Sequence, residues 1–142
     1  MITLEYKIVI NATVESVFAT TIDKKHFSEW TAVFAPNSYF EGSWEKGNTL
    51  YYKCPDENGE IQGMINTIKN HIPNREIFIQ PIGIIKNGVE IMSGEKVKDL
   101  DLTYEIYRFT KLGNRTEVKI IVSALDKHEQ YFNETWPRAL EL

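Results

Sequence analysis

The feature that most limits the fold of this chain is an amphipathic stretch at its end, Asp126–Leu142. Apolar residues in and beside this stretch recur at spacings of three, four and seven, which places them on one stripe of a helix; they are Leu125, Phe132, Trp136, Ala139 and Leu140. Pro137 lacks an amide donor and crowds the preceding turn, so we expect a kink near Trp136. Because most of the remaining chain has the pattern of β-strands, the simplest arrangement is a sheet that bends around this one long helix.

The first third of the chain predicts one strand and two short helices. Thr3–Ile10 alternates apolar and polar residues, as a half-buried strand does. Thr13 and Asp23 are of the type that caps helix N-termini, and each precedes apolar residues at helical spacing. On the second helix, Phe27 and Trp30 lie three residues apart and should share its inner side.

The middle of the chain has the pattern of an antiparallel meander, in which short alternating runs are separated by clusters of Gly, Pro, Asn and Asp. The expected strands cover residues 38–41, 49–54, 60–71, 76–85, 102–110 and 116–123. A change of parity between Ile65 and Ile68 predicts a β-bulge, and Pro81 should lie at an edge or an irregular position. We expect Lys86–Asp101 to form a loop over the mouth of the sheet that can include a helical turn.

Strand alternation also predicts which side chains face the helix. Tyr52 should face inward together with Leu50, and Tyr107 and Phe109 should share an inner face with Glu105. The position of Glu105 is unusual, because a carboxylate on an inner face needs a hydrogen-bond partner or a raised pKa. Glu105 is therefore a candidate polar anchor for a ligand or a candidate acid; the alternative is that it lies at the wet end of its strand.

Length and charge limit the class of protein. The 142 residues fit one domain, residues 1–142, with a substantial core. The net charge is −4 and no run of Lys or Arg forms a stripe that could follow phosphates, which argues against nucleic acid as a partner. No apolar run is long enough to span a membrane, and Met1 leads directly into strand residues, so we expect a cytoplasmic protein.

The residues that usually carry catalysis or bind metals form no recognisable motif in this sequence. Cys54 is the single cysteine, which excludes an internal disulfide and every multi-cysteine metal site. His26, His71 and His128 lie far apart without a carboxylate at ligand spacing. Gly-rich phosphate loops, nucleophile elbows and Cys–His signatures are also missing from the sequence. We therefore assign no catalytic residue, metal or cofactor.

Five segments of the chain have motifs typical of a known superfamily. They are FAPNSYFEGSWEKGN at residues 34–48, GMI at 63–65, IKNGVE at 85–90, EIYRFT at 105–110 and TWPRAL at 135–140. Together they resemble the START-like (SRPBCC) superfamily and, within it, the family named after the activator of the heat-shock protein 90 ATPase. The resemblance covers essentially the whole chain. It implies an α+β helix-grip fold, with a curved antiparallel sheet of about six to seven strands wrapped around a long C-terminal helix and two short helices after the first strand.

The resemblance also implies a hydrophobic cavity between the sheet and the C-terminal helix. Members of the superfamily bind lipids, sterols, polyketides or plant hormones, a minority act as cyclases or hydrolases, and others are co-chaperone domains. Our leading hypothesis is a small protein that binds an apolar or amphipathic small molecule without a cofactor. One alternative is a co-chaperone-like module of the stress response that binds a chaperone. A weaker alternative is an enzyme that uses an inward Glu or Tyr as acid or base.

The candidate cavity residues are the aromatic side chains expected to face inward, together with one carboxylate. They are Phe27, Trp30, Phe34, Tyr52, Glu105, Tyr107, Phe109, Phe132 and Trp136. For any one aromatic residue, ordinary core is the simpler interpretation; as a group they favour a cavity wall more, because a strongly bent sheet leaves space that several large side chains must fill or line. Tyr52 and Tyr107 matter most, since each has a hydroxyl that could orient a mostly apolar ligand.

Overall fold

The computed structural model describes residues 2–32, 34, 37–94, 103–124 and 129–140. Its elements, in chain order, are β1 (Ile2–Ile10), α1 (Val14–Ile22), α2 (Lys24–Thr31), β2 (Tyr39–Gly42), β3 (Thr49–Pro55), β4 (Ile61–Ile72), β5 (Glu76–Lys86), β6 (Val89–Ile91), β7 (Tyr104–Leu112), β8 (Arg115–Ala124) and α3 (Glu129–Leu140). The strands form one sheet in the order β1-β8-β7-β5-β4-β3-β2, with β6 paired to β5, and every pairing is antiparallel.

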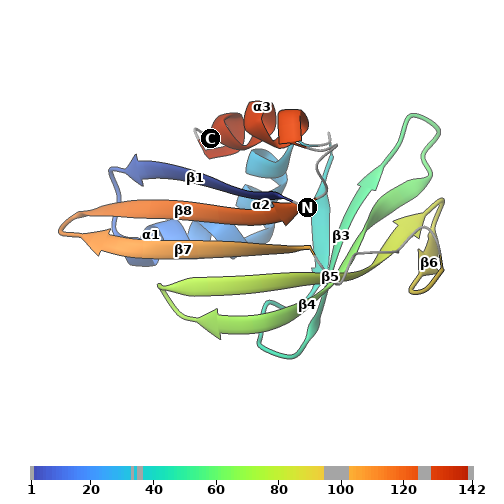
Figure 1. Ribbon diagram of the computed structural model, residues 1–142, viewed down its shortest axis with the longest axis horizontal. Coiled ribbons are helices and arrows are strands. Elements are labelled where there is room, and N and C mark those ends of the chain that lie inside the picture. Colours follow the sequence, from blue (N-terminus) through green and yellow to red (C-terminus); the bar gives the residue numbers. More distant parts are fainter. Residues whose placement is uncertain (1, 33, 35–36, 95–102, 125–128, 141–142) are drawn as a thin grey trace.

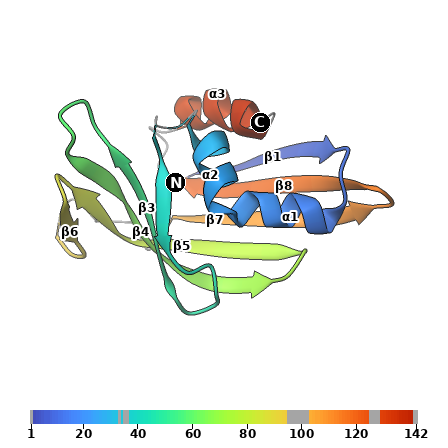
Figure 2. The same ribbon diagram turned by 180° about the vertical axis from the view of Figure 1, so that it is seen from behind.

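The helices are arranged on and beside this curved sheet. Helix α1 covers one face of β7 and β8, as the view from behind shows, and α2 packs against α1 and β2 (Figure 2). Helix α3 lies beside α2 and contacts β1 (Figure 1). The predicted combination of a curved antiparallel sheet, two short helices after the first strand and a C-terminal helix is therefore confirmed.

One part of that prediction changes in the structure. The described residues contain eight strands, because β6 forms within Lys86–Asp101, where we expected a loop; residues 95–101 of that segment lie outside the described residues. The expected cap Asp126 also lies outside them, as does the predicted end of the helix at Leu142. Pro137 lies inside α3, and the kink that it should cause stays a prediction.

Helices α1 and α2 begin at the predicted caps. The side chain of Thr13 accepts a hydrogen bond from the backbone of Ser16, and that of Asp23 accepts one from the backbone of His26. The backbone amide of Asp23 also donates to the carbonyl oxygen of Ala19, at the end of α1. Asp23 therefore ends one helix and begins the next, which leaves no further linker between α1 and α2.

The predicted bulge is present on β4 and brings a polar side chain into the core. The β4–β5 register shifts between Ile65 and Asn66, where Asn66 lies opposite Pro81. Asn66 is only 2% exposed, and its side-chain amide donates to the backbone oxygen of Leu50 at 3.2 Å, which provides the partner that a buried amide requires. The pairing of β5 with β7 ends at Ile79, before Pro81, so the missing proline amide costs no β7 hydrogen bond.

The fold makes a testable prediction at Gly63 on β4. A Cβ atom at this position would overlap the backbone oxygen of Tyr52 on β3. We therefore expect Gly63→Ala to lower the free energy of unfolding by about 1–3 kcal/mol, because the two backbones must move apart. Urea denaturation followed by tryptophan fluorescence measures this change. Lys69→Ala, at an exposed position of the same strand, is the control and should change stability by less than about 0.5 kcal/mol.

Candidate functional site

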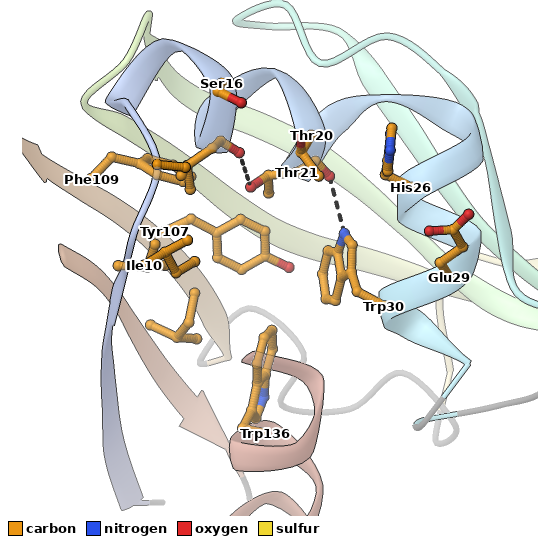
Figure 3. Close-up of a pocket in the computed structure, with 14 residues that line it drawn as sticks. Ile10, Ser16, Thr20, Thr21, His26, Glu29, Trp30, Tyr107, Phe109 and Trp136 are labelled. Atoms are coloured by element: carbon orange, nitrogen blue, oxygen red, sulfur yellow. Dashed lines mark hydrogen bonds between the residues drawn. The ribbon is translucent and has the colours of Figure 1, made fainter. Parts of the chain in front are cut away.

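A pocket of about 190 Å³ lies between helices α1 and α2 and the inner face of the sheet (Figure 3). It is lined by Ile10, Ala12, Ser16, Val17, Thr20, Thr21, His26, Glu29, Trp30, Tyr107, Phe109, Val118, Ile120 and Trp136. The strands supply apolar and aromatic side chains, whereas most of the polar ones come from α1 and α2. For comparison, an apolar cavity of about 150 Å³ binds benzene, so this pocket has room for a small organic molecule.

Three aromatic rings from three different elements form one end of the pocket. The ring centroids of Trp30 and Tyr107 lie 6.3 Å apart, and each ring lies 5.9 Å from that of Trp136. The indole nitrogen of Trp30 donates to the backbone oxygen of Thr21 at 3.3 Å, drawn as a dashed line in Figure 3. The edge-on packing of Tyr107 against both indoles and this hydrogen bond fix the orientation of the rings, so this end of the pocket is preorganised.

Some of the nine residues predicted for a cavity line this pocket and others do not. Those that line it are Trp30, Tyr107, Phe109 and Trp136. Phe34 and Phe132 lie outside it, near α3: the ring of Phe34 packs against Trp136 at 4.9 Å, and that of Phe132 packs against Tyr131 at 5.6 Å. Phe34 therefore packs against α3, and Phe132 belongs to that helix.

Phe27 and Tyr52 lie in an aromatic cluster next to the pocket. Their ring centroids are 5.3 Å apart, and Phe27 also contacts Trp30, which forms part of the pocket wall. Trp44 belongs to the same cluster and is buried, with its ring 6.0 Å from Phe27. Phe27 thus adjoins the pocket through Trp30, whereas Tyr52, Trp44 and Glu105 do not line it.

The sequence reasoning missed the part of the pocket made by small residues. Ala12, Ser16 and Thr20 line it, and Ser16 and Thr20 are four residues apart on α1, so they share one face of that helix. Small side chains on the face of a helix beside a sheet leave space that larger ones would fill. The repeated small residues beside the apolar positions Val17 and Phe18 were the signal that could have indicated the pocket.

Glu105 has the most distinctive electrostatics near the pocket. It is half-buried and pairs across the sheet with the buried residues Ile79 and Val122; this burial raises its pKa from the ordinary 4.5 to about 7, and the nearby Tyr107 hydroxyl partly opposes the rise. Burial and the charge of Glu105 raise the pKa of Tyr107 well above its usual value, so its hydroxyl stays protonated. A carboxyl group with a raised pKa thus lies two residues before a pocket-lining phenol on β7.

Two polar atoms close to Tyr107 are buried without a protein partner. The indole nitrogen of Trp136 has none, and the Tyr52 hydroxyl has none at hydrogen-bonding geometry, although it approaches the Tyr107 hydroxyl closely enough to affect its pKa. An unpaired buried donor costs about 1–3 kcal/mol. Of these two residues Trp136 lines the pocket and Tyr52 does not.

The described histidines have protein partners. A ring nitrogen of His26 lies 2.8 Å from the Asp23 carboxylate, and one of His71 lies 2.7 Å from the backbone oxygen of Trp44. Within the part of the chain that the structure describes, no three His, Cys, Asp or Glu side chains come together as a metal site. In the same part, no helix is both long and apolar enough to cross a membrane.

Comparison with known proteins identifies the fold. No protein-family model matches the sequence, and a search of curated proteins finds no relative. Solved structures do match: the Aha1 dimer from Colwellia psychrerythraea is 18% identical with a TM-score of 0.70, covering 99% of this chain and 91% of that one. The chain has the helix-grip fold.

Two further structures have the same helix-grip architecture. A protein from Arthrobacter aurescens is 18% identical with a TM-score of 0.73 and covers 98% of this chain and 81% of its own. A protein from Nitrosomonas europaea is 13% identical with a TM-score of 0.74 and covers 98% and 89%, respectively. The predicted fold is thus confirmed over nearly the whole length, while the similarity leaves function to be argued from the pocket.

The raised pKa of Glu105 predicts how stability depends on pH. Between pH 4.5 and about 7 the folded protein binds a proton at Glu105 that the unfolded chain has lost, so stability falls as the pH rises through this window. Glu105→Gln removes this loss, and we expect it to raise the free energy of unfolding near pH 8.5 by about 1–3 kcal/mol, with a smaller effect near pH 4.5. Urea denaturation at the two pH values measures the difference.

Glu76→Gln is the matched control with the opposite sign. Burial alone would raise the pKa of Glu76, but hydrogen bonds from Asn70 at 2.8 Å and Arg108 at 3.0 Å lower it overall. The stability that Glu76 contributes is present above its ordinary pKa and is lost as the pH falls, so Glu76→Gln should destabilise near pH 8.5. If both variants destabilise equally at that pH, the assignment of a raised pKa to Glu105 is wrong.

Proposed function

We propose that this protein binds an apolar or amphipathic small molecule in the pocket between α1, α2 and the sheet. The observation that carries the proposal is the pocket itself, whose apolar floor adjoins polar side chains contributed by two helices. Ligand sites of soluble proteins have this composition: mostly apolar walls with a few polar groups that fix orientation.

The distribution of polar groups supports an amphipathic ligand. Phe109, Val118 and Ile120 are buried and form an apolar floor on β7 and β8. Ser16 and Glu29 are exposed and lie on the helices (Figure 3). An amphipathic molecule that placed its apolar part on the floor would bury apolar surface at about 25 cal/mol per Å², while a polar end stayed close to the helices.

The size of the pocket supports a small ligand. Most drug-sized ligands occupy roughly 300–1,000 Å³, and this pocket has about 190 Å³. The three fixed rings at one end restrict its shape. A single ring with a short substituent, or a medium-length chain, is the class that fits.

Filling the pocket tests the proposal. Thr20 is exposed on α1 and lines the pocket, so Thr20→Trp should place an indole in it without removing any core residue. We expect saturation-transfer NMR to show binding of 1-octanol to the wild-type protein and a loss of about tenfold or more in affinity in this variant, because the apolar contact area is taken.

Glu15→Trp is the control for this substitution. Glu15 is exposed on the same helix but does not line the pocket, so the added indole should leave 1-octanol binding unchanged. Equal binding by the wild type and both variants would contradict binding in this pocket. Native mass spectrometry of the purified wild-type protein is a second measurement, in which a co-purified small molecule would support the proposal.

A second candidate function is a co-chaperone-like interaction with heat-shock protein 90. The observation that favours it is the similarity to the Aha1 dimer structure, which extends over 99% of this chain. Such a function would use an exposed surface rather than the pocket. We therefore expect both the wild type and Thr20→Trp to raise the ATPase rate of purified heat-shock protein 90 if this candidate is correct. An unchanged rate, with no complex detected by native mass spectrometry, would exclude it.

A further inference from the structure

The exposed polar residues that line the pocket form its rim, and one of them is a carboxylate without a partner. These residues are Ser16, Thr20, His26 and Glu29. Glu29 lies on α2 directly before Trp30 (Figure 3). Lys25 lies one turn earlier on this helix, yet within the described part of the chain no ion pair or hydrogen bond engages the Glu29 side chain. The charge of Glu29 is therefore available to a ligand.

The charges around the rim are negative. Among the residues that line the pocket, none is Lys or Arg. Lys24, on the same helix as Glu29, extends toward β2, where its Nζ lies 5.7 Å from the centre of the Phe40 ring. The Asp23 carboxylate lies 2.8 Å from a ring nitrogen of His26, which places a second negative charge close to the rim. A cation is the charge complement of such a rim.

Three hydrogen-bond donors of the lining are already committed within the protein. The Thr21 hydroxyl donates to the Val17 carbonyl oxygen at 2.8 Å, and the Trp30 indole nitrogen donates to the Thr21 carbonyl oxygen at 3.3 Å. A neutral His26 that donates from Nδ1 to the Asp23 carboxylate has only an acceptor left, at Nε2. The rim therefore favours a ligand whose polar end donates hydrogen bonds over one that only accepts them.

The Trp30 ring adds a second attraction for a cation beside Glu29. Trp30 is half-buried, whereas Tyr107 and Trp136, the rings against which it packs, are each 2% exposed. Trp30 is thus the ring of this group nearest the rim. The electron-rich face of an indole attracts an ammonium group. The unpartnered indole nitrogen of Trp136 is buried and is no part of the exposed rim.

We propose that the ligand of this pocket is a cationic amphiphile: a small primary amine whose ammonium group binds Glu29 at the rim while its apolar part lies on the floor of Phe109, Val118 and Ile120. This inference rests on the proposed binding function and deepens it by giving the charge of the polar end. An ammonium group has three N–H donors and one positive charge, which match the acceptors and the carboxylate of the rim. A carboxylate ligand of the same length would meet Glu29 as a like charge.

Three probes with alkyl chains of equal length separate charge from apolar contact: octylamine, 1-octanol and octanoate. Near pH 8 an alkylamine is protonated, as a lysine side chain is, and octanoate is ionised. In saturation-transfer NMR at low ionic strength we expect octylamine to bind about tenfold more tightly than 1-octanol, and octanoate about tenfold less tightly. Added salt should reduce both differences, because the rim is exposed.

Substitutions of Glu29 test its part in this preference. Glu29→Gln keeps the size of the side chain and removes its charge, so it should abolish most of the preference for octylamine over 1-octanol. Glu29→Lys should reverse the order of octylamine and octanoate. Since Glu29 is exposed, neither substitution disturbs the core. Glu15→Gln is the matched control: it removes an equal charge from an exposed position of α1 that does not line the pocket, and it should keep the wild-type preference.

The remaining outcomes contradict the proposal in separable ways. An octylamine preference that Glu29→Gln leaves intact, or that Glu15→Gln removes equally, overturns the inference, because the preference then belongs to the net charge of the protein. Unchanged octylamine binding by Thr20→Trp, in which the pocket is filled, also overturns it. If the wild type binds the three probes equally, or octanoate most tightly, the inference fails and the proposed binding function stands. Failure of all three probes to bind contradicts both.

Discussion

The contact between Trp30, Tyr107 and Trp136 is the interaction on which the rest of this structure depends. The three rings come from α2, β7 and α3, which are far apart in the sequence and have no backbone hydrogen bonds to one another. Trp136 is 2% exposed and is the residue by which α3 reaches the pocket. Aromatic pairs in this geometry contribute about 0.5–1.5 kcal/mol each beyond the apolar area that they bury. The cluster therefore joins the helices to the sheet and shapes the pocket at the same time.

Hydrogen bonds at the edge of this cluster hold α3 in register with its neighbours. The Tyr6 hydroxyl on β1 donates to the side chain of Asn133 at 2.7 Å, and the Tyr131 hydroxyl donates to the backbone oxygen of Phe34 at 3.2 Å. Both are near the surface, where each adds about 1 kcal/mol or less. Their main effect is geometric, because they fix α3 along its axis while the buried rings fix its distance from the sheet.

Local rules predicted most of the fold from the sequence. The caps at Thr13 and Asp23 depend on side chains next to the backbone that they bind, and the inward position of Tyr107 follows from strand alternation alone. Strand β6 was missed because three residues cannot show a period, and their strand conformation depends on pairing with β5. Periodicity gives the direction of a side chain but not its depth, so it could not separate Phe27, in the aromatic cluster, from Trp30 in the pocket wall.

Asp23 couples the two helices that cover the pocket. Since this one residue ends α1 and begins α2, its backbone amide and its side chain each satisfy one helix end. Loss of this side chain would remove the cap of α2, whose residues Glu29 and Trp30 line the pocket. The pocket wall therefore depends on a residue that does not itself line it.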